Sequence, residues 1–498
     1  MESKRPYDAL IIGAGIGGLS AGIILSLLGL RVAVIEKNPL PGGMMRGYRR
    51  EGMDCPVGVH YFGSFGEGEP LRRICDYLGV TERMAVERMG QDGPIDRYLF
   101  DDFTFDLPEG LDAFAASLEL AFPDERQPIA QIVDNLRITA DAQNSFAFFS
   151  PAPPLLDTKL FAPLGAYLAG MNCSPGLRNV LGVAARWMGM SESECPVFYH
   201  HFALVSYLLS SWRLRGTGSD LAEAFVSRFE ELGGTLICGD AVTAILASGA
   251  AIGGVRLTSG RVLDGSRLVA AIHPKKVIEM LPEGAVKPRH ARLVGQLAET
   301  EGLFALSVAV DAATHPALPH NIFRLHADRE GALTNGVFYQ LRDGREGKNL
   351  LVIITRSPYP EWSRWEDTTT GRRGPVYAEA KAGWAGRLLR DAEGIFGSLA
   401  GAKVLDAYTP LSLRDWVGSP NGSPYGIMRS MRQLPAVAAL SRLAPAGLYF
   451  AGQNALSPGV LGTLLGSLQV ARQVLGPDRF ASEVFEGLMR GKGKRGSI

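Results

Sequence analysis

The 498-residue sequence has no excess charge of either sign, few cysteines and no disulfide-like cysteine spacing. Its 51 basic and 51 acidic residues cancel, so we expect no nucleic-acid partner. The five cysteines are odd in number and form no CxxC pair; they are Cys55, Cys75, Cys173, Cys195 and Cys238. We therefore expect a reducing, cytoplasmic location, with neither a disulfide framework nor a metal site.

The sequence also lacks a recognisable leader and a convincing membrane span. Lys4 and Arg5 lead directly into an apolar, strand-like segment, so we expect no cleavable signal peptide. Residues 196–212 are apolar and uncharged, but His200, His201 and several serines make them too polar to cross a bilayer comfortably. With 46% apolar and 20% charged residues, the chain is expected to form a globular protein of two or three domains.

What the sequence does contain is a glycine fingerprint near its N-terminus. The short apolar run 9–12 is typical of a strand buried in a parallel sheet, and Gly13, Gly15 and Gly18 follow it. Gly13 is expected to make a tight turn, Gly15 to let the backbone approach a pyrophosphate, and Gly18 to let a helix pack on the strand. The pyrophosphate would lie at the N-terminus of that helix.

A second predicted strand, residues 31–36, ends in Glu36. A carboxylate here can accept hydrogen bonds from both hydroxyls of an adenosine ribose and would repel a 2′-phosphate, which favours FAD or NAD over NADP. Pro41-Gly42-Gly43 then resembles the second glycine pair of FAD enzymes of the two-dinucleotide-binding type, so FAD is the predicted cofactor. The predicted FAD contacts in this region are Gly13, Ala14, Gly15, Gly17, Gly18, Glu36, Lys37, Gly42, Gly43 and Met44.

Residues 53–63 read Met-Asp-Cys-Pro-Val-Gly-Val-His-Tyr-Phe-Gly. This segment resembles the flavoprotein family of phytoene desaturases, carotenoid isomerases and retinol saturases, in which an Asp-x-Gly-x-His-Tyr-type segment follows the glycine pair. Residues 57–61 match the end of that segment, whereas Pro56 stands at the position of the aspartate. The resemblance implies that His60 and Tyr61 lie near the flavin ring; an ordinary core or loop histidine is the alternative for His60.

Two later segments carry the same resemblance. Within residues 216–274 the chain is expected to re-enter the FAD domain through a helix capped by Ser219, with Val242 at the position whose backbone holds the adenine. A third segment contains Ala-Gly-Gln-Asn at 451–454 and a glycine-spaced helix whose N-terminal amides would face the flavin. Its predicted cofactor contacts are Gly452, Gln453, Asn454, Gly459, Val460 and Gly462.

The intervening residues carry less specific signals. Residues 110–215 are predicted to be mostly helical, and their aromatic clusters suit a helical core, a lipophilic substrate tunnel or a patch that rests on a membrane. Tyr425, in a late Tyr-Gly pair similar to the family's, is either an active-site residue or a buried structural tyrosine. The basic tail, residues 490–496, suits a disordered end or contact with anionic lipid.

These signals predict an α/β fold: a discontinuous, Rossmann-like FAD-binding domain, as in amine oxidases and phytoene desaturases, with an inserted α+β substrate domain. The expected FAD-binding segments are 1–79, 216–275 and 441–476, and the expected substrate-domain segments are 80–215 and 276–440. Residues 477–498 would form a C-terminal helix and tail.

The resemblance implies an FAD-dependent oxidoreductase that saturates, desaturates or isomerises carbon–carbon double bonds of a lipophilic polyene or isoprenoid. His60, Tyr61 and Tyr425 are the candidate catalytic residues, since saturation pairs a hydride from the flavin with a proton from a nearby acid. No second glycine fingerprint is found, so the expected electron partner is a diffusing nicotinamide, quinone or oxygen; peripheral membrane contact is one alternative for the aromatic patch and the basic tail. An amine oxidase-type flavoprotein and a non-catalytic flavin- or lipid-binding protein remain alternatives.

Overall fold

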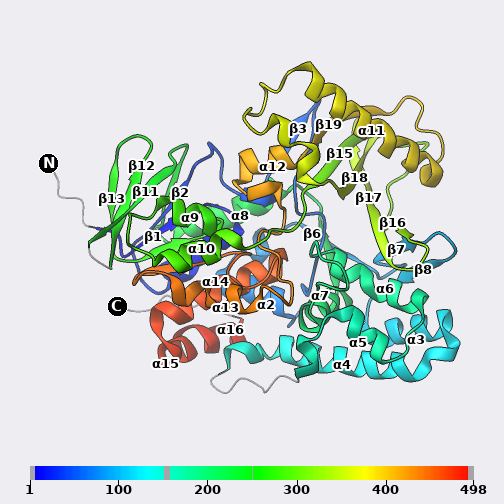
Figure 1. The fold of residues 1–498 in the computed structure, drawn as a ribbon, viewed down its shortest axis with the longest axis horizontal. Helices are drawn as coiled ribbons and strands as arrows, with labels where there is room; N and C mark the ends of the chain where they lie inside the picture. Colours follow the sequence, from blue (N-terminus) through cyan, green and yellow to red (C-terminus); the bar gives the residue numbers. More distant parts are fainter. Residues whose placement is uncertain (1–5, 151–157, 249–250, 492–498) are drawn as a thin grey trace.

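The computed structural model describes residues 6–150, 158–248 and 251–491. An α/β part, at the left of Figure 1, lies beside a second part in which helices pack around a larger, mostly antiparallel sheet. Lys4, Arg5 and residues 492–496 of the basic tail lie outside the described residues. Within the described residues, no helix is both long and apolar enough to cross a membrane.

A five-stranded parallel sheet, ordered β10-β2-β1-β14-β20, forms the centre of the α/β part. Its strands are β1 (Ala9–Ile12), β2 (Val32–Glu36), β10 (Thr235–Cys238), β14 (Leu268–Ala270) and β20 (Leu448–Phe450). Ile12 of β1 lies beside Ile35 on one side and Ala270 on the other, so the strand order reverses at β1. Ligands of such sheets bind at the carboxyl ends of the strands where the order reverses.

Three helices cover this sheet: α1 (Ile16–Leu27), α8 (Gly218–Glu231) and α14 (Gly459–Leu475). Helix α8 begins with a capping box, in which the Thr217 hydroxyl accepts the Asp220 N–H and the Asp220 carboxylate accepts the Thr217 N–H. The predicted cap at Ser219 is wrong, because the helix already begins at Gly218 and Ser219 lies within its first turn; the Ser219 hydroxyl instead accepts the Gly47 N–H at 3.1 Å.

Glycines, which have no side chain, let α1, β1 and α14 approach one another closely. Gly13 has φ of +98°, and a Cβ at Gly18 would lie only 1.9 Å from the Gly13 carbonyl oxygen. A Cβ at Gly17 would lie 2.5 Å from the Cα of Gly452, in the loop that follows β20. The Ser467 hydroxyl of α14 donates to the Gly17 carbonyl oxygen at 2.9 Å, which joins the two helices directly.

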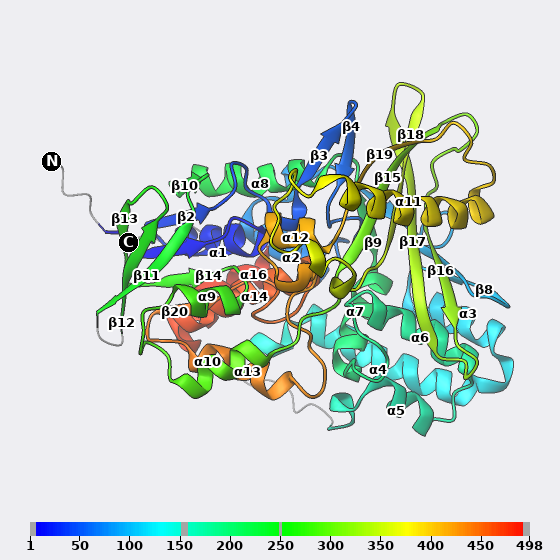
Figure 2. The ribbon, with the colours of Figure 1, turned by 45° about the horizontal axis from the view of Figure 1, so that its top comes forward.

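A seven-stranded sheet, ordered β19-β15-β18-β17-β16-β7-β8, forms the second part, and α11 (Gly374–Phe396) lies across it in Figure 2. Its strands are β7 (Asp96–Leu99), β8 (Thr104–Leu107), β15 (Leu303–Asp311), β16 (Asn321–Ala327), β17 (Leu333–Arg345), β18 (Lys348–Arg356) and β19 (Lys403–Tyr408). β7 pairs in parallel with β16, whereas the other neighbours are antiparallel. Strands that precede α8 in the sequence, β7 and β8, therefore share one sheet with strands that follow it, β15 to β19.

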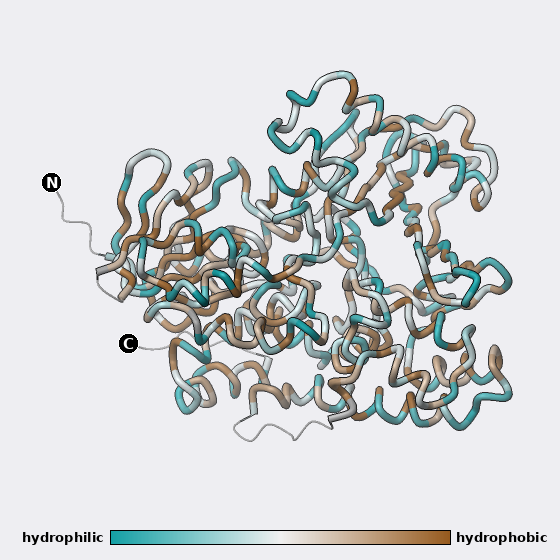
Figure 3. The backbone as a smooth tube through the Cα atoms, viewed as in Figure 1, coloured by the Kyte–Doolittle hydropathy of each residue, from teal (hydrophilic) through white to brown (hydrophobic). Residues whose placement is uncertain are grey.

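The helices predicted within residues 110–215 pack around the β7–β8 end of this sheet. They are α3 (Leu111–Ala121), α4 (Arg126–Asn144), α5 (Leu164–Gly170), α6 (Pro175–Arg186) and α7 (Val197–Leu209). Figure 3 shows apolar segments concentrated in the inner strands and helices, with hydrophilic segments in the outer loops. This distribution places the core between the helices and the two main sheets.

Shorter elements complete the fold. The strands are β3 (Gly47–Arg50), β4 (Met53–Pro56), β5 (Phe62–Gly63), β6 (Val86–Met89), β9 (Ser211–Leu214), β11 (Val242–Ser248), β12 (Ala251–Leu257) and β13 (Val262–Asp264). The helices are α2 (Pro70–Leu78), α9 (Pro274–Met280), α10 (Pro288–Gln296), α12 (Pro410–Val417), α13 (Leu434–Leu443), α15 (Pro477–Phe480) and α16 (Glu486–Arg490). The β5-β9-β6 sheet links the segment after β4 to the end of α7.

The substitution Gly18→Ala tests the close packing of α1 on the glycine turn. The added methyl group collides with backbone, so we expect the free energy of unfolding to fall by about 1–3 kcal/mol, the usual cost of overpacking. Gly383→Ala is the matched control, because Gly383 lies on an exposed face of α11 where an added Cβ would meet no atom within 4 Å. The control should gain up to about 1 kcal/mol from helix propensity. Equal effects of both substitutions in chemical denaturation would contradict this packing.

Candidate functional site

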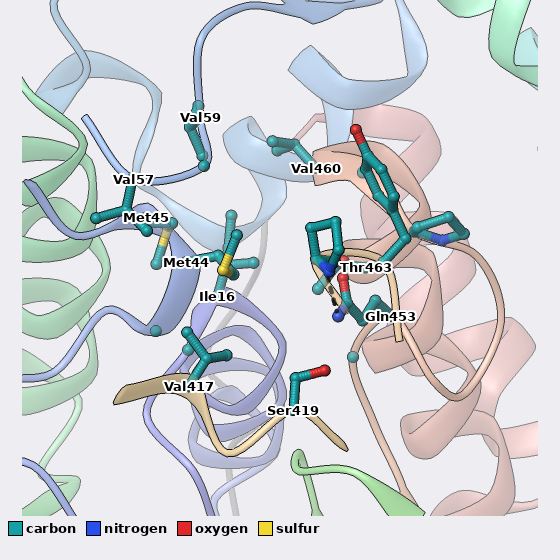
Figure 4. Close-up of a pocket in the computed structure, with 18 of the residues that line it drawn as sticks. Ile16, Met44, Met45, Val57, Val59, Val417, Ser419, Gln453, Val460 and Thr463 are labelled. Atoms are coloured by element: carbon teal, nitrogen blue, oxygen red, sulfur yellow. Dashed lines mark hydrogen bonds between the residues drawn. The ribbon is translucent and has the colours of Figure 1, made fainter. Parts of the chain in front are cut away.

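A cavity of about 480 Å³ is lined by the carboxyl edge of the parallel sheet and by one face of the seven-stranded sheet. Its volume falls within the range of about 300–1,000 Å³ typical of small-molecule sites. In Figure 4, Ile16, Met44 and Val59 lie on one side of the cavity and Val460, Gln453 and Thr463 on the other. The two sides come from the beginning and the end of the chain.

Most of the predicted cofactor residues line this cavity. They are Gly13, Gly15, Gly17, Glu36, Lys37, Gly42, Gly43, Met44, Val242, Gly452, Gln453, Asn454, Gly459, Val460 and Gly462. Ala14 and Gly18 do not line it: the Ala14 N–H donates to Glu36, and Gly18 packs against Gly13. These two residues shape the turn and do not face the cavity.

Two helix N-termini open onto the same end of the cavity. α1 follows Gly15 and α14 follows Pro458, and neither helix has a side-chain cap or an acidic residue in its first turn. The first N–H groups of a helix attract anions because they lack intrahelical partners and lie at the positive end of the helix dipole. This end of the cavity therefore suits a phosphate-containing ligand.

Glu36 is held in a fixed orientation at the end of β2. One carboxylate oxygen accepts the Ala14 N–H at 2.9 Å, and the other accepts the backbone N–H and side-chain amide of Asn38 at 2.9 and 2.7 Å. The side chain is buried, yet the residue still contributes to the cavity wall. Each carboxylate oxygen can accept more than one hydrogen bond, so Glu36 retains capacity for a ligand.

Arg429 holds the loop after β20 and was not singled out from the sequence. Its buried guanidinium donates to the carbonyl oxygens of Leu456 at 2.7 Å, Ile427 at 2.9 Å and Gln453. The Asn454 side-chain oxygen accepts the Ile427 N–H at 3.0 Å, so this amide braces the same loop. Arg429 also contacts the Tyr199 hydroxyl, and its partners are backbone carbonyls and a side chain far away in sequence, so the sequence does not reveal its role.

The three candidate catalytic side chains all line the cavity. Burial, aided by Arg342, lowers the pKa of His60 to about 4, and its Nδ1 has no hydrogen-bond partner among the described residues. Burial raises the pKa of Tyr425 to about 12. His60 is therefore neutral at neutral pH.

Tyr61 is tied to a buried acid that the sequence did not suggest. Its hydroxyl donates to Asp96 at 2.9 Å, and burial raises the pKa of Asp96 to about 7 although hydrogen bonds from Asn321 and Tyr61 oppose the increase. Burial and the nearby Asp96 together raise the pKa of Tyr61 well above its ordinary value. Asp96 begins a strand far from Tyr61 in sequence, and only the fold brings the two together.

Beyond these residues the cavity is walled by aromatic and aliphatic side chains. The Tyr207 ring lies 4.8 Å from both Tyr61 and Trp187, and the Phe338 ring lies 5.1 Å from Phe323 and 5.6 Å from His60. Met188, Leu303, Leu325, Leu333 and Ile354 complete this apolar section. Of the predicted aromatic clusters, Trp187, Phe202 and Tyr207 contribute to the cavity, whereas Phe146 and Phe149 pack in the core beside the parallel sheet.

Charged side chains in the wall of the apolar section are few. Arg186, Glu301 and Arg356 line the cavity, and Arg356 forms an ion pair with Glu301. Across the described ranges, no cluster of three or more His, Cys, Asp or Glu side chains could hold a metal ion. The arrangement thus combines an anion-attracting end with a long, mainly apolar remainder.

Residues 11–78 match the family described as an NAD(P)-binding Rossmann-like domain. The structure is similar to that of an oxidoreductase from Methanosarcina mazei, with a TM-score of 0.65, 17% identity, and coverage of 93% of this chain and 99% of that one. It is also similar to cyclohexylamine oxidase from Brevibacterium oxydans, with a TM-score of 0.60, 18% identity, and coverage of 94% and 100%. The predicted α/β, Rossmann-like fold is confirmed, and the N-terminal segment is of a dinucleotide-binding type.

The curated relatives match the predicted resemblance. All-trans-retinol 13,14-reductase of Macaca fascicularis is 23% identical over 94% of this chain and 85% of its own length. All-trans-zeta-carotene desaturase of Myxococcus xanthus is 24% identical over 54% of this chain and 53% of its own. Prolycopene isomerase 1 of an Oncidium hybrid cultivar is 28% identical over 31% and 26%. The predicted resemblance to retinol saturases, carotene desaturases and carotenoid isomerases is confirmed.

The substitution Arg429→Ala tests how the loop of residues 452–458 is held. It leaves the Ile427 and Gln453 carbonyl oxygens without the Arg429 donor, so we expect the free energy of unfolding to fall by about 3 kcal/mol or more. Arg432→Ala, at a neighbouring exposed arginine, is the control and should change it by less than about 0.5 kcal/mol. Denaturant unfolding measures both, and an Arg429 variant as stable as the control would contradict this role.

Proposed function

We propose that this protein is an FAD-dependent oxidoreductase that acts on carbon–carbon double bonds of a lipophilic polyene or isoprenoid. The observation that carries the proposal is the two-part cavity, in which two uncapped helix N-termini adjoin a section walled by aromatic and aliphatic side chains. The names of the curated relatives, a retinol reductase, a carotene desaturase and a carotenoid isomerase, support the same class of substrate.

FAD fits the residues present at the glycine-lined end. Glu36, with acceptor capacity left on its carboxylate, would hold the adenosine ribose, and Val242 would lie beside the adenine. The N-terminus of α1 would hold the pyrophosphate, while Gln453 and the N-terminus of α14 would hold the flavin end. When bound, FAD supplies hydride exchange with a carbon atom of the substrate.

The protein's own residues would bind the substrate, exclude water and transfer a proton. Phe323, Phe338 and Trp187 would hold the polyene and exclude water from it. His60 is neutral near pH 7 because burial lowers its pKa to about 4, so a protonated imidazole is scarce there. Tyr61 is consequently the preferred proton donor for saturation, or acceptor for desaturation. Tyr425 would help to position the substrate.

The electron partner would be a diffusing nicotinamide, quinone or oxygen, as predicted from the lack of a second glycine fingerprint. Peripheral membrane contact stays a prediction. An amine oxidase-type reaction is the second candidate function, favoured by the similarity in fold to cyclohexylamine oxidase.

The proposal predicts that a polyene changes the redox state of the bound flavin. Under anaerobic conditions, reoxidation of the chemically reduced protein by a retinoid or carotenoid panel would establish saturation, and bleaching of the oxidised protein would establish desaturation. Isomerisation would change the polyene only when the flavin is reduced, without net oxidation. Bleaching by amines alone would favour the amine oxidase alternative, and a protein that takes up no FAD would contradict the proposal.

The substitution Glu36→Arg tests the cofactor assignment. It removes a carboxylate acceptor and adds a cation, so we expect FAD affinity to fall by about tenfold to a hundredfold, as for loss of a charged hydrogen bond. Glu82→Arg makes the same charge change at a side chain that is 94% exposed and should leave the affinity unchanged. Fluorescence titration of the apoprotein with FAD measures both, and retained affinity in the Glu36 variant would count against the assignment.

A further inference from the structure

A chain of buried polar side chains lies behind Tyr61, on the side away from the cavity. The Tyr61 hydroxyl donates to Oδ2 of Asp96, and Asn321 Nδ2 donates to Oδ1 of Asp96, both at 2.9 Å. Gln340 Nε2 donates to Asn321 Oδ1 at 3.0 Å and to the His60 carbonyl oxygen at 3.2 Å. Asp96, Asn321 and Gln340 are fully buried or nearly so, and none of them lines the cavity.

Three of these hydrogen-bonded side chains lie on neighbouring strands of the seven-stranded sheet. Asp96 and Asn321 are paired residues at the start of β7 and β16, and Gln340 comes from the neighbouring strand β17. Within the described ranges, Asp96 forms no ion pair with a lysine, arginine or histidine. An ionised carboxylate without a cation is costly to bury, and a neutral amide would satisfy Tyr61 and Asn321 equally well. The presence of an acid here therefore calls for an explanation beyond packing.

We propose that Asp96 is a positioning residue that sets the direction of the Tyr61 hydroxyl proton and replaces that proton when Tyr61 gives it up. The inference rests on the proposed function, since it assigns a path to the proton that saturation of a double bond consumes. Tyr61 touches the substrate cavity, whereas Asp96 acts only through Tyr61.

The hydrogen bonds decide where a proton on Asp96 resides. Gln340 donates to the Asn321 side-chain oxygen, so the Asn321 NH₂ group faces Asp96 and occupies Oδ1 as a donor. A proton on Asp96 is thereby directed to Oδ2, which faces Tyr61. In the ionised state Asp96 accepts the Tyr61 hydroxyl, which turns that proton away from the cavity. In the protonated state Asp96 donates to the Tyr61 oxygen, which leaves the Tyr61 O–H free to point into the cavity.

The proton and electron balance of saturation is then complete. One carbon of the double bond would receive a hydride, with both electrons, which bound reduced FAD would supply. The other carbon receives the Tyr61 proton as the phenol O–H bond breaks and a C–H bond forms. The Asp96 proton moves to the Tyr61 oxygen, so neutral tyrosine is restored and Asp96 is left ionised. Because Asp96 is buried, water that enters after product release returns the proton through Tyr61. Desaturation uses the same steps in reverse.

The pH dependence follows from the groups that face Asp96. Tyr61 from the segment after β4, Tyr98 on β7 and Tyr207 on α7 all have pKa values raised by burial and stay neutral near pH 7. Asn321 and Gln340 do not titrate, and the adjacent His60 is already neutral. Burial raises the pKa of Asp96 to about 7, so the protonated, donating arrangement is lost as the pH rises through about 7.

The test compares Asp96→Asn with wild type in anaerobic, single-turnover reoxidation of the reduced holoprotein by a polyene, from about pH 5 to about pH 9. Wild type should slow about tenfold for each pH unit above about 7. Asp96→Asn and Tyr61→Phe should react about 100-fold more slowly, with no titration near pH 7. Tyr77→Phe is the matched control, since Tyr77 on α2 is a buried tyrosine that packs in the core beside the parallel sheet and does not line the cavity, and it should behave as wild type. An Asp96→Asn variant with the wild-type rate and pH profile would overturn the inference.

A second measurement needs neither substrate nor turnover. Infrared difference spectra of the holoprotein during a pH titration should show the carbonyl band of a protonated carboxylic acid that appears as the pH falls through about 7. The band should be absent from Asp96→Asn and shifted in Tyr61→Phe. If wild type accepts no polyene, the proposed function fails, and this band still decides whether Asp96 and Tyr61 form a protonation pair. No such band over this pH range would overturn the inference on its own.

Discussion

The structure depends on one close approach, that of Gly17 at the start of α1 to Gly452 after β20. No side chain larger than hydrogen fits at Gly17, and a methyl group at Gly18 would collide with the turn that follows β1. This contact brings the N-terminus of α14 beside that of α1, at the edge of the sheet where the strand order reverses. The positive ends of the α1 and α14 helix dipoles therefore lie at one end of the cavity, which suits an anionic group there.

The remainder of the cavity follows from how the seven-stranded sheet is assembled. Its strands come from residues 96–107 and 303–408, so the chain leaves the parallel sheet twice and builds one common wall. The face of the seven-stranded sheet that lines the cavity carries Phe323, Phe338 and Ile354. A ligand held at the helix N-termini would thus reach from a polar environment into an apolar one. Such a division suits a redox cofactor that meets a lipid-like substrate.

Local features of this fold were predictable and long-range ones were not. The glycine turn, the buried run of β1, α1 and the strand that ends in Glu36 follow from periodicity and turn chemistry within a few residues. The predicted α8 cap at Ser219 was wrong by two residues, because Thr217 caps the helix through its reciprocal hydrogen bonds with Asp220. Strand β16, the Arg429 brace and the contact of Tyr61 with Asp96 depend on partners distant in sequence. Asp96 and Asn321 are polar residues that begin strands β7 and β16, and nothing in the sequence pairs them.

The measurement that tests the central claim most directly is an experimental structure of the purified protein with its bound cofactor. We predict density for FAD along the cavity, with its adenosine at Glu36 and its isoalloxazine ring between Gln453 and the segment that carries His60 and Tyr61. The apolar section beside Phe338 should remain open to a polyene. A nicotinamide dinucleotide in this place, or a flavin bound elsewhere on the protein, would contradict the assignment of this cavity as a flavin and polyene site.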